Sequence, residues 1–189
     1  MKTLSMVAVL AIAAPAFADQ VFLRESELPR ALFGDHVTSA RKNLELSPAE
    51  VAELSRILER KVEIRSYPYL EVRPEGDGKP ILGEVFLMDV IGQSLPITFA
   101  VGVKQDGTLQ DVQVMVYREP HGDEIRERRF RAQFAGKKLQ DPLVVGKDID
   151  AISGATISSA SAAFIAIGVC CGRFLATVAT MMSAVARAM

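Results

Sequence analysis

The sequence is poor in the residue types that build disulfides, metal centres and histidine-dependent active sites. Its 189 residues include two cysteines and two histidines. Cys170 and Cys171 are neighbours, and a disulfide between neighbours is strained, while adjacent thiols lack the spacing of metal ligands. Both lie in a long apolar stretch, so we expect them to be buried on a helix as small apolar side chains.

An excess of charge of one sign is also missing. The formal net charge is −1, with 49% hydrophobic and 24% charged residues, which indicates a folded globular chain and no nucleic-acid partner. Neither a G-x-G-x-x-G nor a phosphate-loop motif is present. Residues 154–158 faintly resemble a nucleophile elbow, but a hydrolase would need a final glycine and a histidine partner. His36 and His121 lie in loop-like surroundings typical of surface residues, so we expect no hydrolase.

The first residues are typical of a secretory signal. Lys2 precedes the apolar stretch Leu4–Ala14, and Ala16-Phe17-Ala18 forms a cleavage site. The stretch is shorter than the roughly 20 residues that span a bilayer. We therefore expect residues 1–18 to be removed and the mature chain to be periplasmic or otherwise extracytoplasmic; an uncleaved anchor is the alternative.

The pattern of turns and apolar runs predicts a single α+β domain. A capping box at Ser47 to Glu50 starts a helix. Strands are expected over 81–91, 97–103 and 109–117, in an antiparallel meander with Asp106-Gly107 as a hairpin turn. A helix is expected over 124–134 and a loop over 141–152. We divide the chain into a helical and irregular region (19–80), a core with helices packed on the sheet (81–173) and an apolar helical extension (174–189).

The segment Asp150-Ala151-Ile152-Ser153-Gly154-Ala155-Thr156 is the most informative. Gly154 permits backbone angles that other residues avoid, and its small neighbours leave room for another group. The turn therefore presents the Thr156 hydroxyl. Ser158 and Ser159 can open the next helix, whose free N–H groups and dipole would favour a bound phosphate.

This segment resembles the D-x-x-[ST]-G-A-[ST] motif of the FMN-binding domain family, which includes flavin subunits of the sodium-translocating NADH:quinone oxidoreductase and of the Rnf complex. Segments 94–102, 114–122, 133–137 and 141–143 also resemble the family. The resemblance implies that a flavin transferase, using FAD and Mg²⁺, attaches FMN to Thr156 through a phosphoester bond. It assigns motif recognition to Asp150, Ser153, Gly154 and Ala155.

The isoalloxazine ring needs an apolar shelf and a few hydrogen bonds. We expect Tyr117, Phe134 and Leu143 to contact the ring and Lys137 to face the phosphate. No residue in the sequence is a candidate for a general acid or base that acts on a substrate. The interpretation is an electron carrier between a membrane redox partner and an extracytoplasmic acceptor. The alternatives are a reductase that acts directly on a small acceptor, and an interaction module without flavin.

The C-terminal stretch 160–186 departs from the family, whose helix after the acceptor is shorter and more amphipathic. It is long enough to span a membrane, but Arg173 near its middle would cost about 2.5–3.5 kcal/mol on insertion scales. We expect the helix to pack on the sheet through about Cys171, with an extension that touches a membrane or a partner subunit.

Export is tested at the N-terminus of the mature chain. The pattern from Lys2 to Ala18 predicts that protein recovered from the producing cell begins at Asp19, which N-terminal sequencing measures directly. Intact Met1 on most exported molecules would instead favour an uncleaved anchor.

Overall fold

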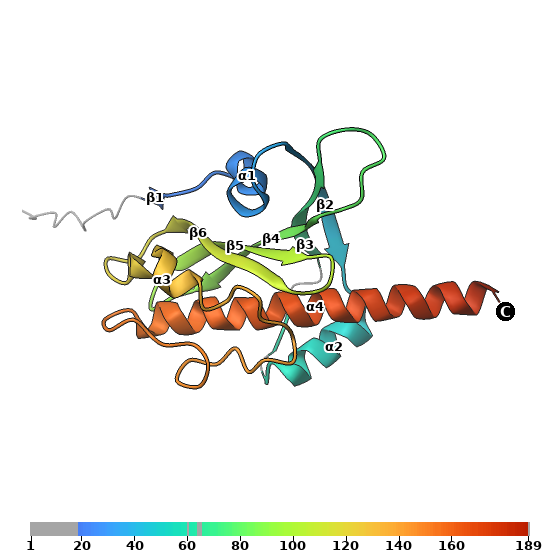
Figure 1. Cartoon of the computed structure of the whole chain (residues 1–189). Helices are drawn as coiled ribbons and strands as arrows, with labels where there is room; N and C mark the ends of the chain where they lie inside the picture. Colours follow the sequence, from blue (N-terminus) through green and yellow to red (C-terminus); the bar gives the residue numbers. More distant parts are fainter. Residues whose placement is uncertain (1–18, 60, 64–65, 189) are drawn as a thin grey trace, which may run out of the picture.

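The chain forms a six-stranded antiparallel sheet with helices on both faces (Figure 1). The computed structural model describes residues 19–59, 61–63 and 66–188, with the backbone alone for 174–188. The strands are β1 (Gln20–Val21), β2 (Val37–Glu45), β3 (Ser66–Pro74), β4 (Gly83–Ile91), β5 (Pro96–Lys104) and β6 (Leu109–Tyr117). The helices are η1 (Glu25–Glu27), α1 (Leu28–Phe33), α2 (Pro48–Ile57), η2 (Asp123–Arg126), α3 (Arg128–Arg131) and α4 (Thr156–Ala188).

Strands β2 to β6 are joined in sequence order as a meander, and the sheet order is β1-β6-β5-β4-β3-β2. The short β1 pairs with β6 at the opposite edge from β2. The chain therefore crosses one face of the sheet between β1 and β2, and α1 lies on that face (Figure 1). The other face is covered by α4 and α2.

The main core lies between the sheet and α4. Alternate residues of β5 point to this side, because side chains of a strand alternate between faces. Ile97, Phe99, Val101 and Val103 are fully buried there, and α4 contributes a row of mostly small side chains. The small side chains of α4 let the helix approach the strands closely. The helix contributes Ala162, Ala163, Ile165, Ala166, Val169, Cys170 and Cys171 to this core.

A smaller core lies between α1 and the opposite face of the sheet. Leu28 and Leu32 of α1 pack there with residues of the central strands such as Ala100. Gly102 faces this contact, and a Cβ there would come within 3.1 Å of Leu32 Cδ2, so a side chain would press on α1. The absence of a side chain at Gly102 thus lets α1 lie close to the sheet.

Helix α4 contains the apolar stretch that is long enough to span a membrane and that was expected to pack on the sheet through about Cys171. Among the described residues it alone is long and apolar enough by composition, over Thr156–Arg173, and 67% of that window is buried in the domain. Arg173 pairs with Glu84 of β4 at 2.5 Å, and both side chains are largely buried. The first half of α4 is therefore a core helix, and its internal charge has a partner in the sheet.

The two cysteines are buried on α4 without a disulfide, as predicted. Burial raises the pKa of Cys170 to about 12 and that of Cys171 to about 11. Both therefore stay protonated near neutral pH and have little thiolate reactivity.

The α+β class, the meander and the capping box at Ser47 are confirmed. The continuous helix over 124–134 was wrong: Glu127 is extended, with ψ 141°, and separates η2 from α3. The reason is spacing. Ile125 and Phe130 are both buried, yet residues five apart lie on different sides of a regular helix. Helix α4 begins at Thr156, earlier than the expected Ser158.

The region 19–80 contains more sheet than the sequence indicated, because β2 and β3 are each nine residues long. Strand β2 is an edge strand whose residues are mostly exposed on both sides, so it shows no apolar alternation. Strand β3 contains Pro68, which argues against a strand in single-sequence reasoning. Both strands are held by pairing that local sequence does not reveal. The boundaries at 1–18, 80/81 and 173/174 stay predictions, and residues 1–18 lie outside the described part of the chain.

Candidate functional site

The acceptor motif forms a tight turn that leads directly into α4. Ala155 N–H donates to Ile152 O at 2.9 Å, which closes the turn. Gly154, at the third position, has φ +84°, and a positive φ at this place favours glycine. No heavy atom lies within 4 Å of the Cβ position at Gly154. As predicted, the turn is made by small residues with open space around it.

Ser159 holds both ends of this turn from inside the helix. Its hydroxyl donates to Ala155 O at 2.8 Å and accepts from Ile152 N at 3.3 Å. The side chain is fully buried. The sequence suggested this serine only as a helix opener. Its position four residues after Ala155 was the available signal, because a serine can bond to the carbonyl four residues earlier in a helix.

A second attachment fixes the first turn of α4 to the sheet. Tyr117 Oη donates to His121 O at 2.6 Å and lies 2.8 Å from Ser158 Oγ. Because a phenol has one hydrogen, Ser158 donates to Tyr117 when Tyr117 donates to His121. The triple contact leaves no room for a side chain at Gly122, where a Cβ would lie 2.6 Å from Tyr117 Oη. Burial raises the pKa of Tyr117, so the hydroxyl stays protonated.

A β-bulge directs Tyr117 toward α4. Val114 faces the main core, and a regular strand would turn Val116 to that side as well. The pairing of β5 with β6 shifts between Thr98 and Phe99, so one extra residue changes the alternation. Tyr117 therefore joins the main core, while Val116 packs on the α1 side.

Thr156 itself is exposed at the first position of α4, beside Ile157, which is 49% exposed. The backbone N–H groups of Thr156, Ile157 and Ser158 have no acceptor among the described residues, as expected for the first turn of a helix. Free N–H groups and the positive end of the helix dipole favour an anion at this point. The hydroxyl of Thr156 is thus exposed beside a point that favours an anion.

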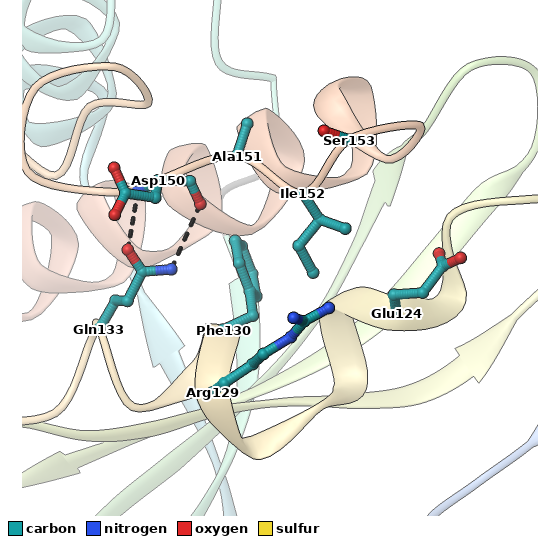
Figure 2. Close-up of a pocket in the computed structure, with 8 residues that line it drawn as sticks. All are labelled: Glu124, Arg129, Phe130, Gln133, Asp150, Ala151, Ile152 and Ser153. Atoms are coloured by element: carbon teal, nitrogen blue, oxygen red, sulfur yellow. Dashed lines mark hydrogen bonds between the residues drawn. The ribbon is translucent and has the colours of Figure 1, made fainter.

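Residues Asp150 to Ser153 form one wall of an open hollow of about 630 Å³ (Figure 2). The facing wall comes from η2 and α3 and the turn after α3. Gln133 joins the walls: its Oε1 accepts from Asp150 N at 2.7 Å and its Nε2 donates to Asp150 O at 3.2 Å. The volume is in the range of ligand sites, about 300–1,000 Å³. The full lining is Glu124, Arg129, Phe130, Gln133, Asp150, Ala151, Ile152 and Ser153.

The four expected flavin contacts are not among the residues that line this hollow. Tyr117, Phe134 and Leu143 are buried in the main core, and Phe134 packs edge-to-face on Phe130 with centroids 5.5 Å apart. Lys137 Nζ pairs with Asp148 at 2.7 Å. Tyr117 instead positions the acceptor helix, a role that the sequence did not indicate.

The pair of Lys137 and Asp148 closes the loop that leads to the motif. Asp148 also accepts from the amides of Leu143 and Val144, at 3.2 and 2.9 Å. Although burial opposes ionisation, the bonds from Lys137 and these amides lower the pKa of Asp148. In this arrangement Lys137 is bound to the protein, so an approach to phosphate would require it to leave Asp148.

Comparison with known proteins is consistent with this geometry. Residues 92–164 match the model of the FMN-binding domain family, a segment that runs from the turn before β5 to the buried part of α4. These residues therefore match the FMN-binding domain family, and the resemblance drawn from the motif is confirmed. The crystal structure of Shewanella oneidensis NqrC is similar at 20% identity and TM-score 0.46, covering 74% of this chain and 82% of that one. A search of the curated proteins gave no match.

The attachment of α4 to the sheet is tested by Tyr117→Phe. The change leaves the ring in place but removes the hydroxyl that joins His121 O and Ser158 Oγ, so buried polar groups lose a partner. We expect the free energy of unfolding in urea to fall by about 1–3 kcal/mol. Tyr69→Phe is the matched control, because the Tyr69 hydroxyl has no hydrogen-bond partner among the described residues; its effect should stay within about 0.5 kcal/mol. Equal losses in both variants would contradict this role.

Proposed function

We propose that this chain is an exported flavoprotein that carries FMN on Thr156 through a phosphoester bond and transfers electrons between a membrane redox partner and an extracytoplasmic acceptor. The observation that carries the proposal is the exposed Thr156 hydroxyl, at a helix N-terminus and at the end of the motif Asp150–Thr156. This residue lies inside the segment that matches the FMN-binding domain family.

In the proposed attachment, a flavin transferase with Mg²⁺ uses FAD as the donor. The Thr156 hydroxyl loses its proton, and its oxygen forms the bond to the phosphorus of the FMN part, with AMP as the leaving group. The free N–H groups of the first turn of α4 would hold the phosphate oxygens. The open turn at Gly154 gives the transferase access, since no side chain covers it.

FMN supplies the redox chemistry, and the protein holds and tunes it. Covalent attachment keeps the cofactor on a protein outside the cytoplasm, where free flavin is scarce. The rigid first turn of α4, fixed by Tyr117 and Ser159, limits the positions that an attached group can reach. A carrier needs one face of the flavin open to its partners. The open form of the neighbouring hollow supports a carrier over a reductase with an enclosed substrate pocket.

The proposed export is supported by the first described residues. Asp19 pairs with Arg118 at 3.0 Å, and β1 begins at Gln20. A mature chain that starts at Asp19 would therefore keep every contact of β1 with β6. Cleavage after Ala18 would not remove the stabilisation that these contacts provide.

The C-terminal extension 174–189 is proposed to touch the membrane or a partner subunit. Its backbone continues α4 as far as Ala188, beyond Arg173, which pairs with Glu84 at the end of the apolar window Thr156–Arg173.

Covalent flavin is tested by mass spectrometry of exported protein made together with a flavin transferase. We expect an added mass of one FMN minus water on the peptide that contains Thr156. Thr156→Ala should abolish it without unfolding the protein, because the side chain is exposed. Thr156→Ser, which keeps a hydroxyl, should retain a part of it. Flavin held covalently by the Thr156→Ala protein would disprove the assignment.

The extension is tested by fractionation of the producing cells. Protein released by a high-salt or carbonate wash agrees with a packed α4 and a peripheral contact. If detergent alone releases the protein, and deletion of 174–189 makes it soluble, the extension is a membrane anchor and the peripheral contact is refuted. A deletion variant with unchanged fractionation would remove any membrane role for the extension.

A further inference from the structure

The hollow beside the motif Asp150–Thr156 combines apolar side chains with hydrogen-bond donors. Ile152 projects from the motif wall toward Phe130 of α3, and Arg129 and Gln133 flank them (Figure 2). We propose that this hollow is the seat of the isoalloxazine ring, with Arg129 as the residue that sets its redox potential. The proposal rests on the attachment of FMN to Thr156.

The position of the hollow supports this seat. One wall is the motif itself, and the turn closed by Ala155 N–H connects that wall to Thr156. A group attached at Thr156 begins next to this wall. The aromatic and aliphatic residues that sequence analysis nominated are closed off in the core, so a flavin ring would reach them only by displacing α4 or the loop before it. The hollow requires no such displacement.

Two side chains can supply hydrogen bonds to a ring in the hollow. Gln133 Nε2 donates one hydrogen to Asp150 O, and its amide keeps a second N–H. Arg129 Nε lies 2.7 Å from Glu127, but the guanidinium has five N–H donors, and its side chain is 73% exposed. The polar pyrimidine part of a flavin carries carbonyl oxygens that accept such bonds.

Charge distinguishes Arg129 from the rest of the lining. It is the one cation among the residues around the hollow, which also include Glu124 and Asp150. Reduced FMN carries negative charge on its pyrimidine part, and a nearby cation stabilises the charged form. Arg129 therefore favours reduction of the flavin, whereas the negative charges of Glu124 and Asp150 oppose it.

The test compares Arg129→Gln with Arg128→Gln in full-length flavin-loaded protein. Both changes remove one positive charge from an exposed arginine of α3, but only Arg129 lines the hollow. Mass spectrometry first measures FMN on the peptide with Thr156. Reductive titration against a reference dye then gives the midpoint potential, and the visible spectrum and fluorescence report the surroundings of the ring.

For Arg129→Gln we expect the ratio of reduced to oxidised flavin at fixed potential to fall about tenfold relative to Arg128→Gln, which is ~30 mV for a two-electron couple. The spectrum should shift in the same variant alone. Full FMN content with identical potentials and spectra in both variants would overturn the ring seat and leave the attachment standing. Unmodified Thr156 in the parent protein would overturn the attachment itself, and the ring seat with it.

Discussion

The contact between α4 and the central strands is the constraint on which the rest of the molecule depends. Fully buried side chains of β5 meet a helix face built largely from alanine and cysteine. Larger side chains on that face would push the layers apart, and such overpacking costs about 1–3 kcal/mol per site. Because the helix lies close to the sheet along this face, α2, α3 and the loop before the motif can close the same core around it. The apolar composition of α4 over Thr156–Arg173 is thus explained by burial in the domain.

The acceptor site follows from the same packing. A helix held along its length could still fray at its first turn, where backbone groups lack partners. Here Tyr117 from the sheet and Ser159 from the helix hold that turn, and they act on its buried side. The exposed side keeps Thr156 and the free N–H groups. The two sides of this helical turn therefore differ: the buried side attaches the turn to the fold, and the exposed side is accessible to the proposed cofactor and its transferase.

The features predicted correctly from the sequence are those formed by residues close to one another in the chain. The capping box at Ser47, the hairpin at Asp106-Gly107 and the small-residue turn at Gly154 were recognised because the residues that form them are adjacent. The edge strand β2 was missed because pairing with β3 holds it, and a strand exposed on both sides has no alternation to detect. The continuous helix expected over 124–134 was wrong, because a regular helix does not bury both Ile125 and Phe130 on one side.

The same distinction applies to the site. The motif predicted the turn, which is confirmed, and the acceptor role of Thr156, which stays a prediction. It did not give Gln133, which is far from Asp150 in sequence yet bonds to both sides of its backbone. Aromatic character suggested Tyr117 and Phe134 as surfaces for a ring, but the β-bulge and the core decide where these side chains point. A single sequence does not show into which part of the fold these side chains point.

The continuity of α4 determines how far apart its two ends are kept. At 1.5 Å per residue, Thr156 lies roughly 25 Å along the axis from Arg173, the last residue of the apolar window Thr156–Arg173. Because the helix is unbroken, it holds these two positions at that separation. A surface that binds the extension therefore contacts the protein at the end of α4 that is far from Thr156. To reach the proposed flavin on Thr156, a redox partner would have to extend away from that surface or approach from the opposite side.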